Sequence, residues 1–112
     1  MIGQTKQKNF RKKVIQVKSI DELERICFQI CSDNINMYVP WYIMASYAYY
    51  VDDNPILSDI TFDRIANKIL KEWETIEHFH KHYLTEDMLK AGTYLGDYPS
   101  RIKDSLKILR NT

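Results

Sequence analysis

The sequence predicts an all-α fold, a compact bundle of four to five helices with a short extended N-terminal arm. The first observation is that apolar residues recur every three or four positions over residues 19–31 and 59–76, which is the spacing of an apolar helix face. The second is that residues typical of helix starts precede these stretches and two later ones: Ser19, Ser58 or Asp59, Thr85, and Pro99-Ser100.

Length and composition fit one globular domain. The chain has 112 residues, of which 45% are apolar and 28% charged. No apolar run approaches the roughly 18 residues of a membrane span, and the basic N-terminus lacks the apolar stretch of a signal peptide. We therefore expect no membrane partner and a cytoplasmic location, which for a viral protein would be the cytoplasm of its host.

The charge is divided unevenly along the chain. Residues 1–18 hold six Lys and Arg and no acid, whereas residues 19–112 hold ten basic and fifteen acidic residues, a net charge of −5. We expect residues 1–18 to form a basic flexible or extended arm, with a short extended segment at Val14–Val17, and residues 19–112 to form the helical domain. The arm could hold the phosphates of a nucleic acid or act as a solubilising leader.

The first helix is expected to begin at Ser19. The spacing of Ser19 and Glu22 is that of a capping box, in which each side chain accepts a hydrogen bond from the other residue's amide. Cys27 and Cys31 lie one helical turn apart, where a disulfide would cross-link little. We expect both to be buried thiols that pack as small apolar groups. The inward stripe consists of Leu23, Ile26, Cys27, Ile30 and Cys31.

The next expected helix, residues 40–51, contains no charged residue. Pro40 suits the first helical position, where its missing N–H does no harm. A helix that is apolar on every side lies in the core or is covered by something on its free face. Its aromatic residues can therefore be core side chains or a stacking wall for a planar ring: Trp41, Tyr42, Tyr47, Tyr49 and Tyr50.

A turn at residues 52–57 leads into a third helix, expected over residues 59–76. Asp59 and Asp63 lie one turn apart near its positive end, where carboxylates stay ionised. They can be a cap and a first-turn acid, or anchors for a ligand. The inward stripe of this helix consists of Phe62, Ile65, Ile69, Trp73 and Ile76.

Two more helices are expected near the C-terminus. A short one opens at Thr85 and closes at Gly92, and a last one runs from Pro99-Ser100 to Leu109. In the last helix the pattern predicts inward-facing Ile102, Leu106 and Leu109 and outward-facing Arg101, Lys103, Lys107 and Arg110.

The sequence shows no catalytic set. It has no glycine-rich phosphate loop, no nucleophile motif and no lysine followed by Asp-Gly, so we do not expect an enzyme. His78, His80 and His82 alternate by two and would share one face of a strand, as metal ligands could. At the C-terminal end of a helix they would point in different directions, and contact with its negative end explains them more simply.

One stretch is similar to a known family. Residues 49–64 read Tyr49-Tyr50-Val51-x-Asp53-x-Pro55-x-x-Ser58-Asp59-x-x-Phe62-Asp63-Arg64. This pattern resembles the N-terminal NMN-binding helical subdomain of bacterial NAD-dependent DNA ligases. The match is strongest over these residues, with a looser helical likeness over residues 40–76. The adenylation, OB and zinc-binding parts of a ligase have no counterpart here, so the resemblance implies no ligation.

The resemblance implies a binding site for NMN or for the NMN half of NAD. In that family, aromatic rings stack on the nicotinamide and carboxylates hold polar groups of the ligand. By position, Tyr49 and Tyr50 would form the stacking wall, and Asp59 and Asp63 would be polar anchors. Phe62 stands where the family has tyrosine, which keeps the ring and loses the hydroxyl. A positively charged planar ring suits aromatic faces with acids nearby.

Two functions follow as hypotheses. The first is a non-catalytic helical module that recognises NMN or NAD and belongs to a phage or mobile element. The second is an interaction factor that reuses the scaffold without binding a nucleotide. It would bind a host or phage protein, or DNA, with contacts from residues 1–18. Heat from NMN or NAD in calorimetry would favour the first hypothesis.

Overall fold

The computed structural model describes residues 16–94 and 96–112, and all of the secondary structure within them is helical. The predicted all-α fold is therefore confirmed for this part of the chain. Five α-helices are joined by turns and by two short 3-10 segments, Ile35–Met37 and Lys81–Tyr83. The α-helices are α1 (Ile20–Asp33), α2 (Tyr38–Tyr50), α3 (Asp59–Lys71), α4 (Glu86–Ala91) and α5 (Ser100–Asn111).

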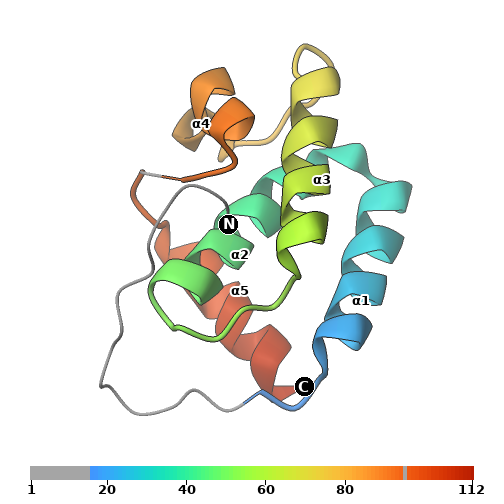
Figure 1. Cartoon of the computed structure of the whole chain (residues 1–112), viewed down its shortest axis with the longest axis vertical. Helices are drawn as coiled ribbons and strands as arrows, with labels where there is room; N and C mark the ends of the chain where they lie inside the picture. Colours follow the sequence, from blue (N-terminus) through green and yellow to red (C-terminus); the bar gives the residue numbers. More distant parts are fainter. Residues whose placement is uncertain (1–15, 95) are drawn as a thin grey trace.

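Helix α2 is the centre of the arrangement. It packs against both α3 and α5, and α3 in turn packs against α4 (Figure 1). Most of its side chains are buried, on every side of the helix, which fits a segment without charge. The uncharged stretch is thus a core helix, so it offers no broad face to a partner. None of the helices in the described ranges is long and apolar enough to cross a membrane.

The predicted starts of α1 and α3 are confirmed by their hydrogen bonds. The Ser19 hydroxyl accepts from the Glu22 amide at 3.2 Å, and the Glu22 carboxylate accepts from the Ser19 amide at 3.4 Å, which completes the capping box. The Ser58 hydroxyl accepts from the Thr61 amide at 3.2 Å, so the cap of α3 is Ser58 and Asp59 is its first residue. Similar side-chain caps and acids at the first turn fix both helices at their positive ends.

Two helix boundaries differ from the prediction. Helix α2 begins at Tyr38, which makes Pro40 its third residue. This position tolerates proline because first-turn amides have no carbonyl partner within the helix. Helix α3 ends at Lys71, whereas the apolar stripe predicts Ile76. Beyond Lys71 the chain turns. Ile76 lies after the end of the helix, yet its side chain is buried in the core.

A lysine from further along the chain stabilises this early end of α3. The Lys81 ammonium donates to the carbonyl oxygens of Trp73 and Ile76, at 2.5 and 3.0 Å. It also lies 4.5 Å from the centroid of a Trp73 ring. The stripe therefore predicted correctly that Ile76 is buried, although the helix ends before it; Lys81 binds two carbonyls of the turn that follows the helix.

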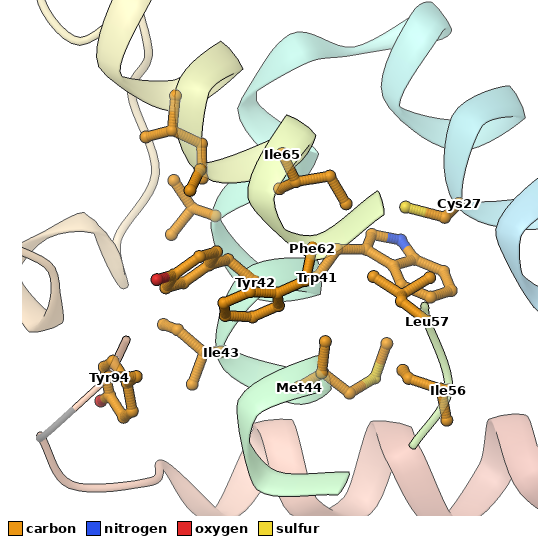
Figure 2. Packing of buried hydrophobic residues seen from close by; sticks show 14 of the residues in the cluster. Cys27, Trp41, Tyr42, Ile43, Met44, Ile56, Leu57, Phe62, Ile65 and Tyr94 are labelled. Atoms are coloured by element: carbon orange, nitrogen blue, oxygen red, sulfur yellow. The ribbon is translucent and has the colours of Figure 1, made fainter. Parts of the chain in front are cut away.

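The core is built around α2 and the residues that close the α2–α3 turn. Tyr42 and Phe62 stack at its centre, with Ile56 and Leu57 from the turn nearby (Figure 2). Cys27 faces the same core from α1, and both cysteines are buried free thiols, as predicted. The Cys27 pKa is raised, first by its hydrogen bond with Cys31 and then by burial, so this thiol is unreactive.

Arg110 differs most from its prediction. It was expected on the outward face of α5, yet it is only 2% exposed. Its guanidinium donates to the Asn54 carbonyl oxygen at 2.9 Å, to the Asp52 carboxylate at 3.3 Å and to the Gln16 side chain. Two separate segments, residue 16 and the turn at residues 52–54, thus converge on this cation of α5 and compensate its burial.

Only the end of the predicted basic arm is described. Residues 1–15 lie outside the described residues, and with them the first half of the extended segment expected at Val14–Val17. The Val17 amide donates to the Arg110 carbonyl oxygen at 3.0 Å, and the Lys18 ammonium donates to the Leu109 carbonyl oxygen at 3.3 Å. Residues 16–18 therefore lie against the C-terminal end of α5.

Candidate functional site

Tyr49 and Tyr50 are the last two residues of α2, at the corner where the chain turns toward α3. Both are half-buried. Their rings meet edge to face, with centroids 4.9 Å apart and an interplanar angle of 84°. This geometry is favourable for aromatic pairs, because the positive edge of one ring lies on the negative face of the other. The pair is thus a preformed aromatic surface that is partly accessible to solvent.

Tyr50 connects this pair to other parts of the chain. Its hydroxyl lies 3.5 Å from the hydroxyl of Thr93, a residue in the segment that follows α4. Burial raises the pKa of the Tyr50 phenol, the Thr93 hydrogen bond partly offsets that, and the nearby Tyr49 and Asp59 raise it further. Asp59 is therefore close enough to Tyr50 to act on it electrostatically. Three of the five predicted site residues, Tyr49, Tyr50 and Asp59, belong to one neighbourhood.

The two acids of α3, Asp59 and Asp63, lie in different environments. Asp59 is exposed at the first position of the helix. Asp63, one turn later, is half-buried and faces α4. It lines a groove of about 220 Å³ together with Ala66, Asn67, Leu89 and Gly92 among others. None of the other four predicted site residues lines this groove.

Gly92 explains how closely α4 approaches Asp63. Its φ of 66° lies in the left-handed region, which favours glycine at the end of a helix. A Cβ atom added at this position would lie 3.0 Å from the Asp63 carboxylate oxygen. The closing glycine predicted from the sequence is therefore confirmed, and it also leaves room for the Asp63 side chain.

Phe62 does not belong to an accessible site. Its side chain is fully buried, and its ring stacks on Tyr42 with centroids 4.3 Å apart and an interplanar angle of 25° (Figure 2). Phe62 lies on the inward stripe of α3, beside Ile65, whereas Asp59 and Asp63 flank that stripe. A ligand contact by Phe62 is thus corrected to a packing role beneath the corner.

Two further neighbours of the corner are Tyr42, which the sequence left as a core residue or part of a stacking wall, and Thr93, which it did not single out. The Tyr42 hydroxyl donates to the Thr93 carbonyl oxygen at 2.6 Å. Burial raises the Tyr42 pKa strongly, and the nearby Tyr50 and Asp63 add to this. Thr93 therefore binds both Tyr42 and Tyr50 through different atoms. No local signal marks Thr93, because both partners lie more than forty residues earlier in the chain.

Two tyrosines of the segment after α4 complete this neighbourhood. The Tyr94 and Tyr98 rings lie 5.1 Å apart, and the Tyr98 ring meets Tyr47 of α2 edge to face at 5.0 Å. Burial raises the Tyr94 pKa to about 12, and it raises the Tyr98 pKa as well, with Tyr94 and Tyr50 contributing. These phenols stay neutral at physiological pH, so the acids supply the negative charge of the corner.

The three histidines do not form a metal centre. His80 is buried and its amide donates to the His78 Nδ1 atom at 3.0 Å, while His82 is exposed. Burial lowers the pKa of both His78 and His80. Over residues 16–94 and 96–112, no group of three or more His, Cys, Asp or Glu side chains could hold a metal ion. The three rings pack instead with Phe79 and Tyr83.

Comparison with known proteins identifies no family for this chain. No family model matches this chain, and neither a curated protein nor a solved structure matches it. The function has to be argued from the residues at the corner and from the resemblance of residues 49–64.

Proposed function

We propose that the protein is a small non-catalytic module that binds a nicotinamide nucleotide, NMN or the NMN half of NAD, at the corner between α2 and α3. The observation that carries the proposal is the partly accessible Tyr49–Tyr50 ring pair with Asp59 in electrostatic range of Tyr50. The resemblance of this stretch to the NMN-binding subdomain of NAD-dependent DNA ligases supplies the identity of the ligand.

The chemistry of the corner suits this ligand. An oxidised nicotinamide ring is planar and positively charged, and such rings are attracted to aromatic faces. Asp59, on the first turn of α3, would compensate the positive charge. Asp63 would hold polar groups of the ligand from the groove beside Gly92. The role of Phe62 would be indirect, since its stacking on Tyr42 supports the helix that carries both acids.

Calorimetry with NMN and NAD at millimolar concentration tests this function. We expect binding heat from both ligands and none from AMP, which lacks the nicotinamide. Tyr50→Ala and Asp59→Asn should each weaken binding about tenfold or more, because each removes one contact worth about 1 to 2 kcal/mol. Asp63→Ala should weaken it by a similar factor.

Asp104→Asn is the matched control. Asp104 is an exposed acid on α5, so its neutralisation changes the net charge equally without touching the corner. It should leave the heat of binding unchanged. Absence of heat from both NMN and NAD with the folded wild-type protein would refute the proposal.

A further inference from the structure

A second groove lies on a neighbouring side of α3, between α3 and α1. It encloses about 360 Å³ and is separate from the corner described above. Phe28 of α1 and Tyr38 at the start of α2 form one wall, and the buried Ile65 forms the base. The other wall consists of three cations of α3, which are Arg64, Lys68 and Lys71. We call this the α1–α3 groove.

One end of the α1–α3 groove is closed by a contact between its two helices. The Glu24 carboxylate of α1 accepts from the Ser58 amide at the start of α3, at 2.8 Å. Burial alone would raise the Glu24 pKa, but hydrogen bonds from Ser58 and Thr61 and the nearby Arg64 outweigh it and lower that pKa. Glu24 thus stays ionised and compensates part of the Arg64 charge.

The charges of the other two cations, Lys68 and Lys71, are not compensated by an acid of the groove. Among the described residues, Lys68 and Lys71 form no ion pair. No acidic side chain lines the groove. From Arg64 to Lys71 the helix rises by about 10 Å, so the cations follow one wall over that length. The groove therefore presents a row of positive charge above an apolar base.

Phe28 has no evident role in the core. It lies one turn after Glu24 on the face of α1 that looks toward α3, and it is half-buried. It is absent from the side chains that pack against the core cluster, whereas its neighbours Ile26 and Ile30 belong to them. Its ring instead lines the groove opposite the cations.

We propose that the α1–α3 groove binds a short segment of single-stranded nucleic acid, with bases against the two aromatic rings and phosphates beside the three cations. Aromatic platforms next to a row of cations are the combination that recognises single strands without sequence preference. An acidic peptide would use the cations but would give the two rings no specific role. The two sites share only Asn67, which lines both grooves and has no role in either proposal, so each site can fail independently.

Fluorescence anisotropy with a labelled ten-residue oligothymidylate and the full chain tests the groove. Lys68→Ala/Lys71→Ala should weaken binding roughly tenfold and reduce the steepness of its salt dependence by about 1.4, at about 0.7 per phosphate contact on a single strand. The matched control is Lys103→Ala/Lys107→Ala, which removes the same charge from two exposed lysines about one turn apart on α5. It should change the affinity less than twofold.

Phe28→Leu separates stacking from charge. Leucine keeps the apolar volume but has no flat face, so we expect at least fivefold weaker oligothymidylate binding. The thermal midpoint should remain within a few degrees of wild type, which a merely structural role would not allow. Equal losses of oligothymidylate affinity in the Lys68/Lys71 and Lys103/Lys107 double variants would overturn the proposal. Unchanged binding in Phe28→Leu, with full competition by a ten-residue polyglutamate, would overturn it in favour of an acidic peptide.

Discussion

The two sides of α3 differ in charge and in chemistry. On the side toward α4 and the end of α2, Asp59 and Asp63 lie beside a cluster of tyrosines. On the side toward α1, three cations face Phe28 and Tyr38. Asn67 lines both grooves and marks the boundary between them. One amphipathic helix thus separates an acidic aromatic surface, suited to a cation, from a basic aromatic surface, suited to an anion.

The largest expected effect on stability comes from replacing Phe62, the buried residue on the inward face of α3. Phe62→Ala removes a fully buried ring that stacks on Tyr42, and we expect a loss of about 3 to 5 kcal/mol in the free energy of unfolding. Urea denaturation measures it. Phe79→Ala is the control, since Phe79 is 59% exposed and should cost less than about 1 kcal/mol. Similar costs for both variants would contradict a core role for Phe62.

Replacing Arg110 should affect the corner more than the groove. Arg110→Met leaves the Asp52 carboxylate and the Asn54 carbonyl without their donor, and we expect a loss of about 2 to 3 kcal/mol. Because these acceptors lie in the turn between α2 and α3, NMN binding should weaken while oligothymidylate binding persists. Lys107→Met on the same helix should be nearly neutral in urea denaturation. Equal stability of the two variants would show that the burial of Arg110 contributes little.

Gly92→Ala should have a smaller effect, confined to the side of Asp63. The added methyl group would be strained at a φ of 66° and would lie 3.0 Å from the Asp63 carboxylate. We expect a loss of about 1 to 2 kcal/mol in urea denaturation. Asp104→Asn at an exposed position of α5 is the control and should be nearly neutral. If Gly92→Ala weakened oligothymidylate binding as much as NMN binding, the two sides of α3 would not be independent.

The smallest effect at neutral pH should come from Tyr42→Phe. It removes one buried hydrogen bond to the Thr93 carbonyl oxygen, worth about 1 kcal/mol. The folded protein holds the Tyr42 pKa above its ordinary value near 10, whereas the unfolded chain releases this proton near pH 10. The contribution of the neutral Tyr42 phenol to the free energy of unfolding is therefore fully present below pH 10, and it is lost as the pH rises further.

The pH dependence gives this prediction a second readout. Urea denaturation of the wild type should show a fall in stability between pH 10 and pH 11, and Tyr42→Phe should make that fall shallower. The described structure contains other tyrosines with raised pKa values, so the slope should decrease without vanishing. An identical slope in both proteins would mean that Tyr42 titrates normally in the folded state.

Local sequence signals predicted much of the fold. The capping box at Ser19, the cap expected at Ser58 or Asp59 and the closing Gly92 depend on residues within a few positions, and each is confirmed, with Ser58 as the cap. The early end of α3 was not predictable in this way, because the apolar stripe continues to Ile76 after the helix has ended, and the carbonyls that follow the helix are bound by Lys81. The burial of Arg110 depends on partners 56 and 58 residues away, which no helical period reveals.

Some of the proximity among the candidate site residues was predictable. The order Tyr49, Tyr50 and Asp59 around a short turn indicated that they lie near one another; the two rings are in contact, and Asp59 acts electrostatically on Tyr50. Phe62 was misassigned because its position on the inward stripe was outweighed by its place in the family pattern. Thr93 was missed because its two tyrosine partners come from α2, far away in the sequence.

Proton NMR of NMN with the protein tests most directly whether the α2–α3 corner accepts a nicotinamide ring. Stacking on Tyr49 or Tyr50 predicts upfield shifts of the nicotinamide ring protons, which should disappear in the Tyr49→Leu/Tyr50→Leu variant and persist in Asp104→Asn. Nicotinamide resonances that stay unshifted at saturating wild-type protein, or that shift equally with the double variant, would contradict the account.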